Sequence, residues 1–314
     1  MRHYIILNIL LLCGLALDGS AQLPKAKSPA APAPRSRSEI EGVLAKTSKL
    51  QPTENLKHIN IVLVADKKDH GTNEHDYPLW QQRWRILLSG TETGAVNLYG
   101  PPQDSSKSGS GAKNVTVMTA QAWPDQQQFA QADVIVVFCY IDWDEQKLVQ
   151  LQQYLESGGG FVPVHPATWP MPKPLKEVAE LTGCGGFTRY RHGPVKLTIT
   201  AKDHPICLGL PETIDFIDET YWPMTPEVKN GRIKVLAISE ENVSEGSAET
   251  KPQPVFWTYS YGKGRVFGCM PGHYTWTFDD PYFRLLLLRG IAWSAGRWPY
   301  RFDSLATYGI ALKD

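Results

Sequence analysis

Histidine side chains gather in segments that follow apolar runs of the sequence, where they could bind a metal ion or transfer protons. Four of the eight histidines lie in such segments: His70, His75, His165 and His273. Imidazoles that face one another across a cleft bind a divalent transition metal when a third nitrogen or oxygen ligand joins them. Without a metal, one imidazole can remove a proton while another donates one. The residue types leave both uses open.

We expect three of these histidines to form the centre of a site. His70, His165 and His273 are the predicted ligands of zinc, manganese or nickel, and no nucleotide cofactor is expected. The predicted catalytic groups are His165, His273 and Glu219, and Glu219 serves as an acid or as a fourth ligand. His75 is interpreted instead as part of a helix start.

Aromatic residues point to a sugar ligand. The sequence has ten Trp and thirteen Tyr, and several stand beside turn residues rather than inside apolar runs. Rings in loops often line sugar sites, because the C–H face of a pyranose stacks on the ring while its hydroxyls bind polar groups. The predicted substrate-binding residues are Trp169, Tyr221, Trp222, Trp276 and Asp142. Proton removal beside the ketone of an oxidised sugar would drive isomerisation, epimerisation or β-elimination.

The elements that must position these residues follow an α/β pattern. Residues 59–65 and 133–138 are apolar apart from Asn60 and Asp133, which is typical of strands buried in a parallel sheet. Helices are predicted over 78–89 and 144–157, and a further strand over 161–164. The other predicted elements are strands over 114–119, 195–200, 234–239, 255–260 and 265–270 and a helix over 281–295. This order favours a flavodoxin-like, doubly wound, mostly parallel sheet with added C-terminal strands, which binds ligands at the carboxyl ends of its strands.

The N-terminus resembles a signal peptide. A short basic start precedes a mostly apolar stretch from Tyr4 to Leu17, and small residues precede Gln22. The segment that follows is rich in Pro, Ala, Ser and Lys, with a short helix expected around Glu39–Leu50. The predicted organisation is a signal peptide over 1–21, a tether over 22–57, one domain over 58–303 and a tail over 304–314. We therefore expect an exported protein, periplasmic or secreted.

Charge and cysteine content restrict the expected partners. With 32 basic and 32 acidic residues, the chain has no electrostatic reason to bind nucleic acid or an acidic membrane. No later segment is apolar for long enough to span a bilayer. Cys139, Cys184, Cys207 and Cys269 lack the spacing of a metal knuckle or a redox pair, so buried thiols are expected. A small carbohydrate is the expected partner, and homo-oligomerisation is left open.

Five motifs, in this order, resemble the ThuA-like (trehalose utilisation) family. They are Lys68-Asp69-His70-Gly71 with His75-Asp76-Tyr77-Pro78, Gly158 to Ala167, Tyr190-Arg191-His192-Gly193-Pro194, Asp218-Glu219-Thr220-Tyr221-Trp222, and Gly262 to His273. The resemblance covers residues 58–303. It implies the fold of class I glutamine amidotransferases and a role in disaccharide catabolism, with 3-keto-glycosides as implied substrates.

The same resemblance implies a departure from amidotransferase chemistry. His165 stands at the strand-to-helix turn where amidotransferases carry a cysteine nucleophile, and His273 falls where their catalytic histidine would. Asp279 and Asp280 follow His273 at a longer distance than the usual partner acid. A Cys–His mechanism therefore lacks its nucleophile.

A sugar-active lyase, isomerase or hydrolase is the preferred hypothesis. One alternative is a non-catalytic carbohydrate-binding or accessory module. Another is a thiol hydrolase that uses Cys139, Cys184 or Cys269.

Overall fold

Continuously apolar strands form the middle of the parallel half of the sheet, because only strands covered on both faces can be so apolar. Every residue of β3 (Val134–Phe138) and β4 (Gly160–Pro163) is buried, as is nearly all of β1 (Ile59–Ala65). The computed structural model describes residues 29–50, 56–90, 92–101, 112–226 and 233–314. The folded unit to which these strands belong spans residues 31–314.

The described residues form a nine-stranded sheet in the order β2-β1-β3-β4-β9-β8-β7-β5-β6. Its remaining strands are β2 (Val115–Gln121), β5 (Arg189–Ile199), β6 (Thr213–Trp222), β7 (Ile233–Asn242), β8 (Thr250–Tyr261) and β9 (Gly264–Cys269). The half from β2 to β9 is parallel, and the half from β9 to β6 is antiparallel. The predicted α/β class is confirmed. The sheet is evenly mixed rather than mostly parallel, since the later strands pair with their neighbours in antiparallel fashion, β8 and β9 through a tight turn.

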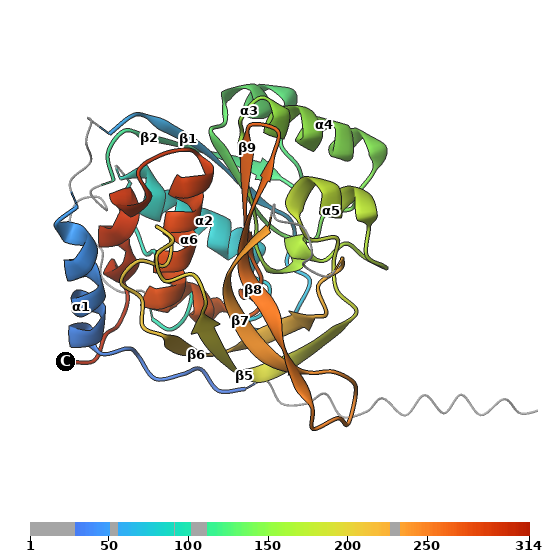
Figure 1. Ribbon diagram of the computed structural model, residues 1–314. Helices are drawn as coiled ribbons and strands as arrows, with labels where there is room; N and C mark the ends of the chain where they lie inside the picture. The colour runs from blue at the N-terminus through green and yellow to red at the C-terminus, as the bar shows by residue number, and fades with distance from the viewer. Residues whose placement is uncertain (1–28, 51–55, 91, 102–111, 227–232) are drawn as a thin grey trace, which may run out of the picture. The chain divides into compact units, whose positions relative to one another are not determined.

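Helices lie on both sides of the parallel half of the sheet (Figure 1). They are α1 (Arg37–Ser48), α2 (Tyr77–Ser89), α3 (Gln126–Gln131), α4 (Glu145–Glu156), α5 (Lys176–Thr182) and α6 (Pro281–Ser294), with 3-10 turns η1 (His165–Thr168), η2 (Thr275–Asp279) and η3 (Pro299–Thr307). Aspartates 76, 144 and 280 cap α2, α4 and α6 by accepting backbone N–H bonds. Among the described helices, none has the length and apolar character needed to cross a membrane.

The strands and helices with strong periodicity lie where the sequence predicted them, and β6 is the main element that was missed. The segment from Arg37 to Ser48 is the short helix expected near Glu39–Leu50, and its Ile40 and Val43 are buried. This part of the predicted tether is therefore folded. Near the other terminus, Lys313 pairs with the backbone beside α1. The predicted signal peptide, and the tether as far as residue 28, lie outside the described residues.

The four cysteines of the folded unit are buried free thiols, as predicted. Burial raises the pKa of Cys139, Cys184 and Cys207 to about 12, and it raises the pKa of Cys269 well above its ordinary value. Because the thiolate is the nucleophilic form, these groups are poor nucleophiles at neutral pH. Their environment argues against the thiol-hydrolase hypothesis.

We predict that iodoacetamide leaves these four thiols unmodified in the native protein and alkylates all of them in guanidinium chloride. The reason is that both access and thiolate formation require unfolding. Mass spectrometry of tryptic peptides locates each modification. Rapid alkylation of Cys139, Cys184 or Cys269 in the native protein would restore the thiol hypothesis.

Candidate metal centre

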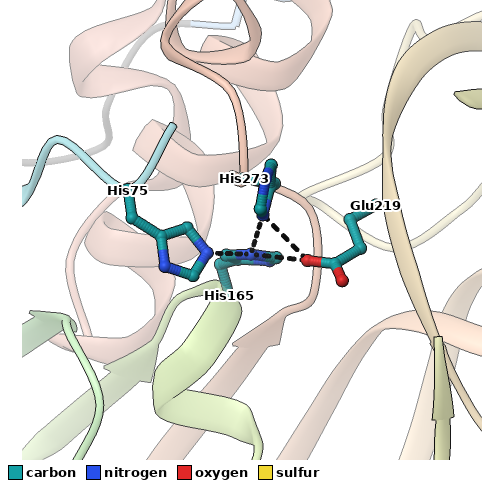
Figure 2. A group of neighbouring side chains, drawn as sticks. All are labelled: His75, His165, Glu219 and His273. Atoms are coloured by element: carbon teal, nitrogen blue, oxygen red, sulfur yellow. Dashed lines mark hydrogen bonds and ion pairs between the residues drawn. The ribbon is translucent and has the colours of Figure 1, made fainter. Parts of the chain in front are cut away.

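Three buried histidines meet at the carboxyl ends of parallel strands, where α/β sheets bind their ligands. His75 lies in the loop after β1, His165 follows β4, and His273 follows β9. Strand β6 adds Glu219 from the antiparallel half of the sheet. All four side chains point toward one another, and all four are buried (Figure 2). We call this group the His3Glu cluster.

Nitrogen and oxygen atoms of the His3Glu cluster lie at ligand-to-ligand distances. The Nε2 atom of His165 is 2.9 Å from His75 Nε2 and 3.3 Å from His273 Nδ1. The Oε2 atom of Glu219 is 2.9 Å from His273 Nδ1 and 3.2 Å from His165 Nε2. Ligands held at about 2.0–2.1 Å from a single ion lie about 3.3–3.4 Å apart in a tetrahedron and about 2.8–3.0 Å apart at right angles. The spacing therefore fits a shared divalent cation.

Backbone bonds between two loops hold His75 beside His273. The His75 N–H donates to the His273 carbonyl at 2.9 Å, and the Thr275 N–H donates to the Asn73 carbonyl at 2.9 Å. A buried carboxylate adds a second restraint: Asp218 accepts the N–H bond of His273 at 3.0 Å, and also binds the N–H groups of Gly272 and Glu219. Residues far apart in the sequence are thus fixed by main-chain contacts.

His165 occupies a strained turn directly after its strand. Its φ is 52°, in the left-handed region that non-glycine residues seldom adopt, and His75 has a φ of 43°. Such conformations cost about 1–3 kcal/mol each and persist where the surrounding structure imposes them, often at functional sites. At this turn, the 3-10 turn η1 is closed by a 2.7 Å hydrogen bond from Thr168 Oγ1 to the His165 carbonyl. The strain points to a functional reason for a histidine here.

Hydrogen bonds fix which ring nitrogens carry protons. The Nδ1 atom of His165 lies 2.9 Å from the Met270 carbonyl, which can only accept, so Nδ1 is the donor. His75 Nδ1 lies 3.0 Å from Asp69 Oδ1 and donates for the same reason. In neutral rings, both Nε2 atoms then carry lone pairs, which face each other at 2.9 Å. The Tyr221 hydroxyl, 2.8 Å from His165 Nε2, can donate to one of these lone pairs, whereas a cation between the rings would satisfy both.

The protonation states of His75, His273 and Glu219 suit a metal cation. Burial lowers the pKa of His75 to about 3, and burial also lowers the pKa of His273, so both rings are neutral. Burial raises the pKa of Glu219, but the adjacent His165 and His273 outweigh this effect and leave its pKa below the ordinary range. The Asp69–His75 bond is the carboxylate–histidine pair that usually orients a metal-bound imidazole. The residues present therefore fit a divalent ion.

Substitution of Asp69 by asparagine is predicted to weaken metal binding about 10–100-fold, because the orienting bond to His75 is altered. Chelator competition with zinc, manganese and nickel measures the dissociation constant. Asp66→Asn is the matched control, since Asp66 lies in the same loop and bonds its neighbour Lys67. Equal affinities for wild type and Asp69→Asn would contradict this role.

The structure brings together most of the predicted site and exchanges one histidine. His165, His273 and Glu219 converge, and His75 takes the place expected for His70. The His70 ring lies beside the cluster, half-exposed, 3.8 Å from the His75 ring and 2.8 Å from Asp69 Oδ1 through its Nδ1. The hydrogen bond to Asp69 raises the pKa of His70 against the effect of its partial burial. One signal in the sequence could have placed His75 at the sheet edge: Asp76 caps α2, so His75 lies at the end of the loop that joins β1 to this helix.

The predicted substrate residues divide into two groups. Tyr221 stacks on His165 with ring centroids 4.9 Å apart, and Trp169 contacts Tyr221 at 4.6 Å. Trp222 and Trp276 are buried, and their indole N–H groups donate to backbone carbonyls. Asp142 is exposed, and it is absent from the groups of potential metal ligands in the described residues.

The match to a family model decides which family the chain belongs to. The model for ThuA, described as trehalose utilisation, matches residues 100–294, which is more than half of the chain. The chain belongs to the ThuA family. The matched range contains His165, Glu219 and His273, and His75 precedes it. This membership supports a carbohydrate-related role.

Solved structures of ThuA-like proteins share the fold. One from Bacteroides uniformis ATCC 8492 has a TM-score of 0.56 and 18% identity, and the match covers 78% of this chain and 94% of that one. One from Parabacteroides merdae ATCC 43184 has a TM-score of 0.52 and 21% identity, and the match covers 76% of this chain and 90% of that one. At these identities the likeness shows the fold alone. No curated protein matches the sequence.

Proposed function

We propose that this protein is an exported, divalent-metal-dependent enzyme that transfers protons on an oxidised disaccharide, such as a 3-keto-glycoside. The observation that carries the proposal is the pair of opposed Nε2 lone pairs of His75 and His165, 2.9 Å apart in a buried cluster with an ionised carboxylate. Membership of the ThuA family supports the carbohydrate as substrate class. Zinc, manganese and nickel all suit a set of imidazoles and a carboxylate.

The chain's own groups divide the work between holding the ion and moving the proton. His75, His165, His273 and Glu219 would hold the ion, which would supply Lewis acidity toward the ketone oxygen of the sugar. His70 lies beside the cluster, and its Nδ1 is bound by the carboxylate of Asp69. Its second ring nitrogen is the group that takes the proton from the carbon next to the ketone. Isomerisation, epimerisation and β-elimination share this first step.

The proposal also covers the export of the protein and the class of its parallel half-sheet. The basic and apolar start of the sequence supports a signal peptide over 1–21, followed by release into the periplasm or the medium. N-terminal sequencing of the exported protein tests this, with Gln22 as the expected first residue. The strand order β2-β1-β3-β4-β9 supports assignment of the parallel half to the flavodoxin-like, doubly wound class.

Hydrogen exchange tests the enzyme directly. A 3-keto-disaccharide is incubated in D2O with the metal-loaded protein, and NMR follows the signal of the C–H groups beside the ketone. Exchange is expected with the loaded protein and not after EDTA treatment, and elemental analysis is expected to give one ion per chain. Sugar binding without either metal or exchange would favour the non-catalytic carbohydrate-binding module instead.

A further inference from the structure

Half-exposed aromatic rings surround the buried His3Glu cluster. Two of the exposed large hydrophobic side chains of the described residues are Tyr190, at 58%, and Tyr140, at 38%. With Trp169, His192 and His70 they form a group that we call the aromatic rim. The His3Glu cluster itself is almost wholly covered, since its four residues are buried. A ligand that approaches the cluster therefore meets the rim first.

The rim is connected to the cluster by ring contacts on two sides. On one side Trp169 lies 6.0 Å from Tyr190, which lies 5.8 Å from His192, and His192 lies 4.7 Å from His273. On the other side the Tyr140 ring lies 5.9 Å from His75. The rim thus extends away from the metal ligands mainly along Tyr190 and Trp169.

The register of β5 and β6 explains why Tyr190 and Glu219 of the His3Glu cluster lie on the same face of the sheet. In the β5–β6 pair, His192 lies opposite Glu219, and Tyr190 lies opposite Tyr221. Directly paired residues point to the same face of a sheet, and residues two apart on a strand do so as well. One face therefore presents Glu219 and His192 at one level and Tyr221 and Tyr190 at the next, about 7 Å further along the strand.

Tyr190 contributes little to the protein core, because more than half of its side chain is exposed. It is the most exposed of these rings, while Tyr221 below it is buried and already stacked on His165. An exposed aromatic face next to a reaction centre suits the C–H face of a sugar, and its displacement from the cluster suits a second sugar unit. Binding energy from a non-reacting unit can position the reacting one.

We propose that Tyr190 and Trp169 form a second sugar subsite, which holds the non-reacting ring of a disaccharide while the reacting ring lies over the His3Glu cluster. This inference rests on the proposed function, because it takes the cluster as the reaction centre. It makes Tyr190 a specificity-determining residue that separates disaccharides from monosaccharides. The ligand class of the subsite is a neutral hexopyranose.

Calorimetric titration with trehalose, maltose, cellobiose and glucose tests the subsite without turnover. The metal-loaded protein is expected to bind at least one disaccharide more tightly than glucose. Tyr190→Ala is expected to lower that disaccharide affinity about 10-fold and to leave the glucose affinity unchanged, while Tyr190→Phe retains the wild-type affinities. Tyr261→Ala is the control. This partly exposed tyrosine lies at the turn between β8 and β9, away from the carboxyl ends of the parallel strands, where the cluster lies.

Three results would overturn the subsite: no preference of wild type for a disaccharide, an unchanged disaccharide affinity in Tyr190→Ala, or an equal loss for glucose. Circular dichroism of each variant shows whether it is folded. Titration of EDTA-treated protein separates this inference from the proposed function. Disaccharide binding that depends on Tyr190, found without metal or exchange, would keep the subsite and refute the enzyme. Metal-dependent exchange with an affinity independent of Tyr190 would do the reverse.

Discussion

The His165→Ala protein is expected to lose its bound metal and with it the hydrogen exchange on a keto-sugar. His165 Nε2 lies within 3.3 Å of each of the other three ligand atoms, so its removal opens the centre of the cluster. Loss of an orienting partner alone typically costs 10–100-fold in affinity, so loss of this ligand is expected to cost more than about 100-fold. Elemental analysis and chelator competition measure the effect.

A pair of neighbouring histidines supplies the sharpest control. His75→Ala is expected to lose the metal, whereas His70→Ala keeps the metal and loses the exchange, because His70 lies outside the cluster. His58→Ala is expected to change neither quantity, since His58 is exposed just before β1 and bonds Thr116 of β2. A His75→Ala protein that retains its metal, or a His70→Ala protein that loses it, would contradict the assigned ligand set.

The strained backbone of His165 gives the His165→Ala substitution a second measurable effect, on stability rather than on metal binding. Alanine at this position keeps the left-handed φ of 52°, whereas glycine adopts it freely. Without metal, His165→Gly is therefore expected to be more stable than His165→Ala by about 1 kcal/mol, after allowance for the greater entropy of glycine in the unfolded chain. Urea denaturation of the two EDTA-treated variants measures the difference. Lower stability of the glycine variant would show that the turn is not strained.

The sequence was sufficient for the position of most of the site. Strands with continuous apolar runs are recognisable from residue type, and the carboxyl ends of parallel strands must share an edge. That reasoning placed His165 and His273 together, although more than 100 residues separate them. It selected His70 rather than His75 from the same loop, whereas the structure places His75 in the cluster. The choice depends on the turn through Asn73, whose φ is 64°, and on backbone bonds to the loop after β9.

Other features depended on contacts that residue types do not reveal. Two consecutive acids, Asp218 and Glu219, interrupt the apolar alternation of β6, so the strand was missed. Both acids are buried because one binds three backbone N–H groups and the other faces the histidines. Trp222 and Trp276 were expected to meet substrate, but each is buried with its indole bonded to a strand carbonyl. Partners of this kind are supplied by tertiary structure.

Replacement of Asp279 by alanine is expected to lower the free energy of unfolding by about 3–5 kcal/mol, because it leaves a buried charge unpaired. Its partner Arg284 is fully buried in α6, and the guanidinium Nη2 atom donates to Asp279 Oδ1 at 2.9 Å. The same carboxylate accepts the backbone N–H groups of Leu98 and Tyr99. Removal of one partner of a buried ion pair costs far more than removal of an exposed charge.

Urea denaturation measures the loss, and Asp142→Ala serves as the control, since an exposed carboxylate is expected to change stability by less than about 0.5 kcal/mol. A double variant, Asp279→Leu with Arg284→Met, is expected to recover part of the loss, because apolar side chains can replace a buried ion pair. Recovery stays incomplete, since Arg284 also donates to the carbonyls of Phe278 and Tyr308.

Metal affinity separates this structural role from a catalytic one. Asp279 and the adjacent Asp280 were considered as partner acids of His273, but Asp280 caps α6 and bonds Arg35, and Asp279 pairs with Arg284. The affinity of Asp279→Ala for metal is therefore expected to stay within about threefold of wild type under conditions where the variant is folded. A large loss of affinity in a folded variant would instead tie Asp279 to His273, through the short turn η2 that joins them, and would make the ion pair part of the site.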